Sequence, residues 1–349
     1  MDMNRRLDFS YGYTLTGCVL VSFIFFSAST FACATCGCTL DSDAVNGLGA
    51  TTGWHLSLEL NYINQDQLRT GSHSASVASV VNTPANPALG GGEIEHQTLN
   101  RYLTTGLSYS PHKDWRIDLK IPYISRDHST YGEQESPYTP SESAVEQLSS
   151  VHVGSLGDIK LITSYLGLLP TRNLGIQFGV KLPTGDHGSR ILFSTGPGAG
   201  TPLDASLQAG TGSTDVIMGA YYVKAISQTI DAFASSQFQA AIKQPRVDIG
   251  HDYRPGNTAT VSIGVRYLEN PRWMPAIQLN LSHRSADQGA LGDPTGTAGS
   301  VAYLSPGMTV QVTHRLHAYG FMQVPIYSHL SGYQLFPRWT ASVGLNYAL

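Results

Sequence analysis

From about residue 53 onward, the chain alternates between apolar and polar positions in a series of short segments. In the segment 115–123 the odd positions are apolar or aromatic, and three of the even positions are charged: Arg116, Asp118 and Lys120. Alternation with a period of two predicts a β-strand with one face in an apolar medium and the other in a polar one. The chain is therefore expected to be built from two-faced strands.

About a dozen segments of this kind follow one another. We predict strands at 54–63, 98–109, 115–124, 156–166, 173–182, 214–225, 230–242, 258–268, 273–282, 302–313, 317–327 and 338–349. Neighbouring antiparallel strands can be joined by very tight turns, whereas parallel strands need a long crossover. Several of the gaps are only a few residues long, which indicates an antiparallel sheet.

The connections between these segments are alternately short and long. The short ones are 111–114, 167–172, 227–229, 270–272 and 314–316, and the long ones are 64–97, 126–155, 183–213, 243–257, 283–301 and 328–337. The long connections are rich in Gly, Ser, Pro, Thr and Asn, which predicts flexible, solvated loops. Short turns on one side and long loops on the other are typical of a bacterial outer-membrane barrel. Both ends of the barrel sequence are then expected on the short-turn side.

The composition is typical of a β-barrel and argues against a nucleic-acid-binding protein. Of the 349 residues only 13% are charged, there are 36 Gly and 18 Tyr, and the mean hydropathy is -0.10. The net charge is -4 and no run of Lys or Arg occurs, which argues against nucleic-acid binding. We predict an all-β chain forming a single antiparallel transmembrane β-barrel of about 12 strands, with short periplasmic turns and long extracellular loops. A soluble β-sandwich is the alternative, but it does not explain the loop asymmetry.

The first residues read as an export signal. Arg5 and Arg6 precede an apolar run at 18–26, and small residues follow at 28–34. The apolar run is short for a membrane span of ~20 residues. We therefore expect a signal peptide at 1–32, a periplasmic cysteine-containing segment at 33–53, and the barrel at 54–349.

The last predicted strand has a pattern of its own. Alternate residues from Trp339 to Leu349 are apolar, and an aromatic residue, Tyr347, lies near the end. Such a strand resembles the terminal signal with which outer-membrane barrels are inserted, although Leu replaces the usual final Phe.

Four short motifs resemble one protein family. They are GSLGDIK at 154–160, GVKLPTGD at 179–186, GTGSTD at 210–215 and QVPIY at 323–327. In this order they resemble the outer-membrane barrels known as the MetA-pathway of phenol degradation family, over about 98–349. The resemblance implies a barrel that moves small, often hydrophobic compounds across the outer membrane, and not phenol chemistry.

The motifs also have a physical interpretation. Pro183 ends a strand because proline cannot donate to the sheet, and Gly-Asp favours a turn. Five charged residues of the motifs are therefore predicted at or near the outer rim: Asp158, Lys160, Lys181, Asp186 and Asp215. Such charges could filter solutes or form a polar cluster that specifies the fold, and the sequence leaves both readings open.

A second charged set is predicted inside the barrel. The neighbours of Arg116, Asp118 and Lys120 are apolar and should face lipid, so the three charges should face the lumen. Charges away from water need partners, and Glu59 is a candidate partner. A packed polar interior and a selectivity filter are the two alternatives.

The cysteine cluster CATCGC is unusual for a plain porin. Cys33, Cys36 and Cys38 lie within six residues, a spacing that suits a disulfide or redox role, or soft-ligand binding of copper or zinc. Acylation of Cys33 is a third reading. Eight histidines fall in or beside the predicted loops: His73, His96, His128, His152, His187, His251, His283 and His329.

The sequence favours a transporter over an enzyme. His283 lies near Ser282, Ser285 and Asp287, but no full nucleophile constellation is visible. We expect a porin-like passive transporter for small solutes, including hydrophobic or aromatic ones, in the outer membrane of a Gram-negative bacterium. Its partners would be outer-membrane lipid and the solute, with no resident cofactor. A metal- or redox-linked barrel and a structural or adhesive barrel are the alternatives.

Overall fold

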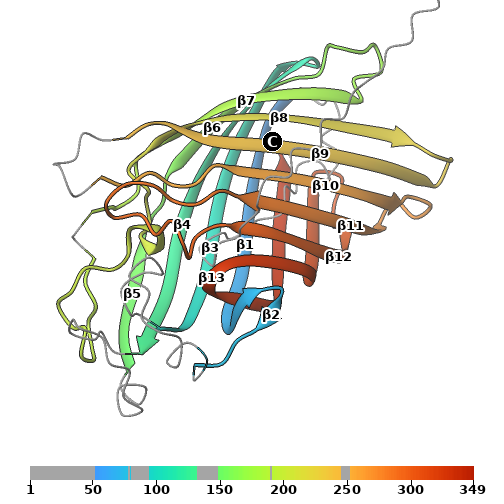
Figure 1. Cartoon of the computed structure of the whole chain (residues 1–349). Helices are drawn as coiled ribbons and strands as arrows, with labels where there is room; N and C mark the ends of the chain where they lie inside the picture. The colour runs from blue at the N-terminus through green and yellow to red at the C-terminus, as the bar shows by residue number, and fades with distance from the viewer. Residues whose placement is uncertain (1–51, 78, 80–93, 132–147, 189–190, 245–251) are drawn as a thin grey trace, which may run out of the picture.

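The computed structural model describes residues 52–77, 79, 94–131, 148–188, 191–244 and 252–349. Over these residues the chain forms one antiparallel sheet that curves round and closes on itself (Figure 1). The predicted all-β antiparallel barrel is confirmed. The predicted signal peptide and the three cysteines after it lie outside the described residues.

Eleven strands form the closed ring, and each pairs with the next. They are β1 (Gly53–Gly71), β3 (Ile94–His112), β4 (Trp115–Tyr131), β6 (Ile159–Tyr165), β7 (Leu174–Leu182), β8 (Thr214–Ala225), β9 (Ile230–Lys243), β10 (Thr258–Tyr267), β11 (Trp273–Arg284), β12 (Gly299–Gln311) and β13 (Leu316–Ala348). β13 pairs with β1 and closes the ring. Two strands lie outside it: β2 (His73–Ser74) pairs with β1, and β5 (Leu148–Leu156) pairs with β4.

β13 crosses the wall twice. Its first half pairs with β12 and its second half with β1. The Ala348 amide donates to the Arg315 carbonyl at 2.8 Å, so the two ends of the strand lie side by side. The turn lies at Ser331 and Gly332, where Gly332 has a φ of 55° that favours glycine. With β13 counted twice, twelve strand segments cross the wall, in agreement with the predicted strand number.

The prediction of a long loop at 328–337 is wrong. In the structure these residues are strand on both sides of a tight turn. Tyr333 pairs with Thr70 of β1, and the side chains of Leu330 and Phe336 are buried in one cluster with Val301. The segment is strand because β1 extends to Gly71, well beyond its predicted end at 63, and gives these residues a partner.

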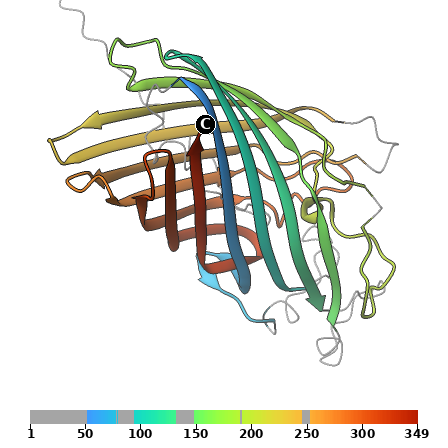
Figure 2. The same ribbon diagram turned by 180° about the vertical axis from the view of Figure 1, so that it is seen from behind.

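β5 and β6 share one neighbour. β5 pairs with the second half of β4, from Tyr123 to Tyr131, and β6 pairs with the first half next to the short turn, from Trp115 to Lys120. The strand pairing along β4 is interrupted between β5 and β6, at Gly157 and Asp158. There the Gly157 amide donates to the carbonyl of Pro122 at 2.8 Å. Figure 2, seen from behind, shows β1, β3 and β4 running side by side with β5 at the lower end of β4.

The outer face of the wall is an apolar band with aromatic rings at its edges. Trp54 stacks on Tyr109 near the short turns, and Tyr62 stacks on Trp339 eight residues further along, with ring centroids 4.5 Å and 5.5 Å apart. Outward-facing leucines of β1 lie between them: Leu56, Leu58 and Leu60. Eight residue steps span about 26 Å along a strand, or about 20 Å for a strand tilted by ~40°. This is close to the apolar height of an outer-membrane barrel, about 25 Å.

The short turns all lie at one end of the barrel. Two of them are tied together by an ion pair, in which Arg172 donates from Nε to Asp114 Oδ1 at 2.5 Å. Arg172 has a φ of 53°, so a left-handed backbone in the β6–β7 turn aims its side chain at the β3–β4 turn. The hydrogen bond from Arg172 holds the pKa of Asp114 below its ordinary value. The chain end also lies here, because the Leu349 amide donates to Trp54 O at 3.0 Å.

Within the described residues, no helix is long and apolar enough to cross a membrane.

Candidate functional site

Alternate residues of β4 face opposite sides of the wall. Trp115 and Ile117 are 47% and 41% exposed on the outer face, whereas Arg116 and Asp118 between them are 9% and 3% exposed. The structure therefore places Arg116, Asp118 and, by the same alternation, Lys120 on the lumen face. The inner wall of this part of the barrel is charged.

The short-turn end of this wall holds a compact ion pair. Arg116 Nε donates to Asp118 Oδ1 at 2.7 Å, and Ser108 of β3 bridges the two side chains. Glu59, the predicted partner of this ladder, has other contacts instead. Its carboxylate accepts hydrogen bonds from Asn61, at 2.8 Å, and from the hydroxyl of Tyr319.

Three lysines lie side by side across neighbouring strands. Lys120 is directly opposite Lys160, Lys160 is opposite Lys181, and Lys181 is opposite Asp215. Directly opposed residues have Cβ atoms about 5 Å apart. The row runs along the lumen face from β4 to β8, and it brings together four residues that the sequence assigned to two separate sets.

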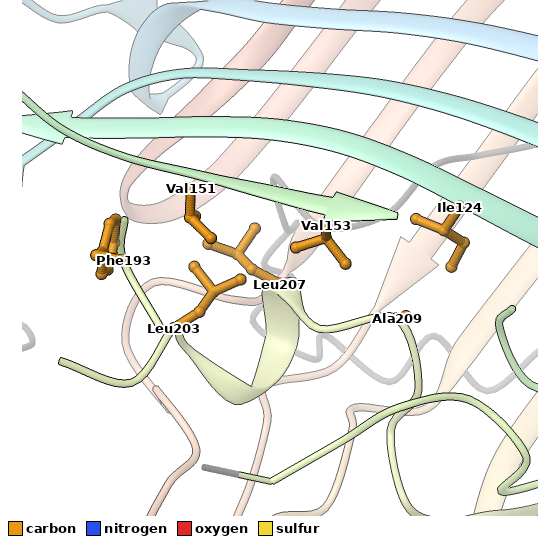
Figure 3. Packing of buried hydrophobic residues seen from close by; sticks show 7 residues of the cluster. All are labelled: Ile124, Val151, Val153, Phe193, Leu203, Leu207 and Ala209. Atoms are coloured by element: carbon orange, nitrogen blue, oxygen red, sulfur yellow. The ribbon is translucent and has the colours of Figure 1, made fainter. Parts of the chain in front are cut away.

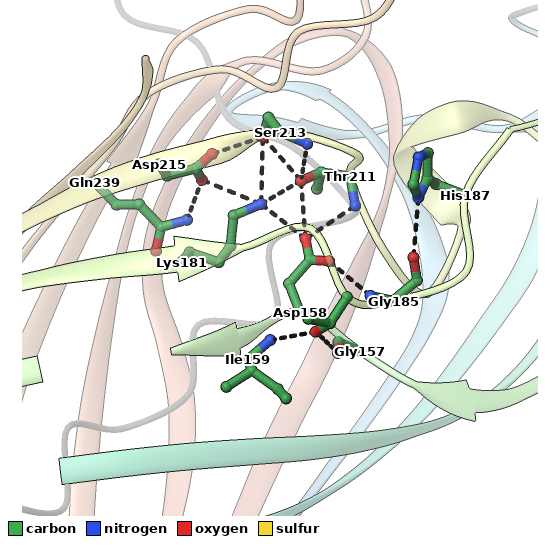
Figure 4. A network of polar contacts seen from close by, with 11 residues as sticks. Gly157, Asp158, Ile159, Lys181, Gly185, His187, Thr211, Ser213, Asp215 and Gln239 are labelled. Carbon is green, nitrogen blue, oxygen red and sulfur yellow. Dashed lines mark hydrogen bonds and ion pairs between the residues drawn. The ribbon is translucent and has the colours of Figure 1, made fainter. Parts of the chain in front are cut away.

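Lys181 is the centre of a buried polar network (Figure 4). Its ammonium group donates to Asp158 Oδ2 at 2.8 Å and lies 3.3 Å from Asp215 Oδ2. It also contacts the hydroxyl groups of Thr211 and Ser213. The side chains of Lys181, Asp158 and Asp215 are only 4%, 7% and 3% exposed.

The two carboxylates of the network are saturated with donors. Asp158 Oδ1 accepts from the Gly185 amide at 3.0 Å, and its Oδ2 accepts from the amide and hydroxyl of Thr211, both at 3.0 Å. Asp215 accepts from Ser213 Oγ and from Gln239 Nε2, both at 2.6 Å. Buried charges are tolerated when their lone pairs and protons are satisfied in this way.

Three of the four sequence motifs meet in this network. It ties the start of β6, the end of β7 and the start of β8 to one another through Asp158, Lys181 and Asp215. Gly185 and Gly210 come so close that a Cβ atom on Gly185 would lie 2.8 Å from the Gly210 Cα. These contacts fit the reading of a polar cluster that specifies the fold.

Asp186 lies outside the network. Its side chain is exposed, and its Oδ2 accepts from Ser155 Oγ at 2.7 Å. Its backbone carbonyl accepts from the Gly210 amide at 2.8 Å. The GVKLPTGD motif thus places Lys181 in the wall and Asp186 on the rim.

The segment after this motif folds into the barrel instead of lying in solvent. Phe193, Leu203 and Leu207 are buried against Val151 and Val153 on the inner face of β5 (Figure 3). A single 3-10 turn, η3 (Ala205–Leu207), carries Leu207 into this cluster. The prediction that 183–213 is a solvated loop is wrong for Phe193, Leu203, Leu207 and Ala209, whose buried side chains cover apolar positions of the inner wall, while the residues between them remain partly or fully exposed.

Arg126 anchors this inward segment from the wall. Its guanidinium donates to the carbonyl of Leu207, to Asn100 Oδ1 at 2.5 Å and to the Tyr102 hydroxyl at 2.8 Å. Arg126 was not among the predicted residues, because the strand was expected to end at residue 124. The alternation continues through Arg126, His128 and Thr130, which are all buried, and that signal could have extended the strand.

The opposite part of the lumen wall is aromatic. Phe233 of β9, Ala276 of β11, and Tyr319 and Phe321 of β13 form one buried cluster, with Val223 packed against it. Their strand neighbours point outward, so this cluster faces the lumen.

Glycines of adjacent strands make room for these rings. A Cβ atom on Gly264 would overlap the ring of Phe233, and one on Gly307 would overlap the ring of Phe321. The rings thus lie flat along the inner wall over neighbouring backbone, and the lumen has a charged side and an aromatic side.

The residues considered for an enzyme do not form a catalytic group. His283 Nδ1 lies 3.1 Å from Ser300 Oγ on the neighbouring strand, and not at Ser282 or Ser285. Asp287 is fully buried and accepts from Arg284, at 2.5 Å, and from Tyr253, at 2.8 Å. Among the described residues no three His, Cys, Asp or Glu side chains are grouped as metal ligands would be.

Comparison with known proteins gives the fold. No protein-family model matches the sequence, and no curated protein matches it. The COG4313 outer membrane channel from Pseudomonas putida F1 is similar in structure with a TM-score of 0.57 at 10% identity, over 86% of this chain and 96% of that one. The toluene transporters TbuX of Ralstonia pickettii (TM-score 0.45, 11% identity, 86% of this chain and 90% of that one) and TodX of P. putida (0.40, 8%, 89% and 93%) are less similar. The first likeness shows that the chain has the fold of an outer-membrane β-barrel.

Proposed function

We propose that this chain is a passive channel of the Gram-negative outer membrane for small solutes, including hydrophobic or aromatic ones. The observation that carries the proposal is the wall itself. Its outer face is an apolar band with aromatic edges, and its inner face is lined by Arg116, Lys120 and Lys160 on one side and by Phe233 and Phe321 on the other. A closed wall of this kind can sit in lipid while its inner face carries polar and charged groups.

Two further observations support the proposal. The P. putida protein that shares the fold is itself an outer membrane channel. The four sequence motifs resemble the MetA-pathway of phenol degradation family, and three of them converge on Lys181. We propose membership in that family on this basis, with lipid and a small solute as the partners.

Electrical and flux measurements test the proposal. The protein, refolded or purified from membranes, is inserted into planar bilayers and, separately, into vesicles that swell when a small sugar enters. We expect discrete conductance steps and faster swelling than in vesicles that carry heat-unfolded protein. A correctly folded protein that neither conducts nor speeds the entry of any small solute would exclude a channel.

The metal- or redox-linked alternative depends on Cys33, Cys36 and Cys38, which lie outside the described residues. Metal analysis of the wild type against the variant with all three replaced by Ser tests it directly. Equal copper and zinc contents in the two proteins would remove the metal form of this alternative.

A further inference from the structure

The inward segment, residues 191–209, lies on the lumen side of the wall. It packs on Val151 and Val153 of β5 (Figure 3). These two valines point inward, because Leu156, which alternates with them along the strand, is exposed on the outer face. The segment therefore takes up space inside the outer part of the barrel.

Backbone hydrogen bonds attach the first part of this segment to the edge of β5 that faces away from β4. The Ser150 amide donates to the Thr195 carbonyl at 3.2 Å, and the Ser194 amide donates to the Ser150 carbonyl at 2.9 Å. The Gly198 amide donates to the hydroxyl of Ser149 at 2.9 Å. The segment thus continues the sheet at this edge.

The second part of the segment is held by burial and by one anchor. Phe193, Leu203 and Leu207 are only 4%, 2% and 1% exposed, and Arg126 of β4 donates to the Leu207 carbonyl. Withdrawing three large apolar side chains into water disfavours an open form by at least about a thousandfold. The segment is therefore a fixed part of the passage and not a lid that opens.

The space that remains beside the segment is small. Twelve strand segments about 4.8 Å apart and tilted by ~40° give a backbone diameter of about 24 Å. A layer packed on a sheet through its side chains lies about 10 Å from that sheet, so each set of side chains fills about 5 Å. An inner layer on one side leaves roughly 4 Å between facing side chains, against roughly 14 Å without that layer.

We propose that the inward segment is a fixed constriction in the outer part of the barrel and sets the upper size of the solutes that enter. This constriction rests on the proposed channel function and restricts its solutes to small, compact molecules. Its narrowest part lies between the segment and the facing wall.

Asp204 marks the face of the segment that is turned toward the passage. It immediately precedes η3, and its side chain is exposed, whereas Leu203 and Leu207 on either side are buried against the wall. A charge on this face acts on ions that pass through the constriction, as charged rings do in selective pores.

Single-channel conductance of a shortened variant tests the constriction. Residues 191–209 are replaced by Gly-Ser-Gly-Ser, which keeps the contact between Asp186 and Gly210, and the uncovered Val151 and Val153 are changed to Thr. We expect the conductance in potassium chloride to rise at least about twofold, because the passage widens. A trisaccharide should speed the swelling of vesicles that carry the variant but not of those with the wild type. A gel shift on heating confirms that the variant is folded.

A point substitution tests the same segment in the full chain, and it decides even if the shortened variant does not fold. Asp204→Lys should shift the reversal potential in a potassium chloride gradient toward anion preference, because a positive charge in a narrow passage favours anions. Lys224→Asp is the matched control. It reverses a charge on the outer face of β8, where Tyr222 is also exposed, and it should leave the reversal potential unchanged.

Equal conductance of the wild type and the folded shortened variant would overturn the constriction, as would an unchanged reversal potential in Asp204→Lys. Either result leaves the channel function in place. Current from the shortened variant alone would support the constriction in its strongest form, in which the segment closes the passage. No current from any of these proteins would exclude the channel function, and the constriction with it.

Discussion

Replacing Lys181 by Met should destabilise the barrel by about 3 kcal/mol. Removing one partner of a buried ion pair typically costs about 3–5 kcal/mol, because the other charge stays buried without compensation. We expect the lower end of this range. Asp158 keeps its donors from Gly185 and Thr211, and Asp215 keeps Gln239, so neither carboxylate is left bare.

The assay is reversible urea unfolding of the folded protein from lipid vesicles, followed by tryptophan fluorescence. All four tryptophans lie on the outer face, 42–52% exposed, and report directly on the loss of the lipid environment: Trp54, Trp115, Trp273 and Trp339. Lys113→Met removes a charge of the same sign from an exposed turn and should change the free energy of unfolding by less than ~0.5 kcal/mol.

A second substitution separates charge from packing. Adding Asp215→Asn to Lys181→Met removes one of the two buried negative charges that no longer face the lysine, so the double variant should be more stable than Lys181→Met alone. The network does not stabilise the wall if the free energy of unfolding of Lys181→Met lies within ~0.5 kcal/mol of the wild-type value. The same conclusion follows if adding Asp215→Asn lowers that free energy further.

Three further predictions follow from other parts of the wall. Leu207→Ala should leave a cavity costing about 2–5 kcal/mol, and hydrogen exchange should show lost protection confined to the inward segment. Gly264→Ala should destabilise the barrel because the new methyl group overlaps the ring of Phe233, and Phe233→Ala in the same chain should restore part of the urea midpoint; additive losses would contradict this contact. Arg172→Ala should raise the pKa of Asp114 toward its ordinary value, as followed by carbon NMR of the carboxylate from neutral to acidic pH; an unchanged titration would show that the ion pair is not formed in solution.

The alternation of residues was enough to predict the wall and its inner face. Each strand needs only its own pattern to define its two sides, so the lumen placement of Arg116 and Asp118 followed from their apolar neighbours. The short turns were also predicted well, since a few residues leave no choice other than an antiparallel neighbour.

Contacts between strands could not be predicted in the same way. Which residue faces Lys181 depends on the stagger of β7 against β6 and β8, and no single strand encodes that stagger. The sequence therefore placed Asp186 with Lys181 as rim charges, although the structure separates them. The inward segment escaped prediction because an irregular segment has no periodicity to reveal its buried face: Phe193 ends a short apolar run at 191–193, of which Leu192 is exposed, and Leu207 lies between two polar residues.

The contacts of Gly185 and Asp186 with Gly210, which join the two ends of the inward segment, have a consequence for engineering. The Gly210 amide bonds to the Asp186 carbonyl, and Gly185 packs on Gly210, so the two ends of the insert are fixed to each other independently of what lies between them. Another peptide could therefore be grafted between these two ends without resetting the registers of β7 and β8, provided that it keeps the apolar side chains at Phe193, Leu203 and Leu207 that cover the inner wall. Such a graft should leave the lipid-facing surface intact while it gives the outer opening of the barrel a new shape.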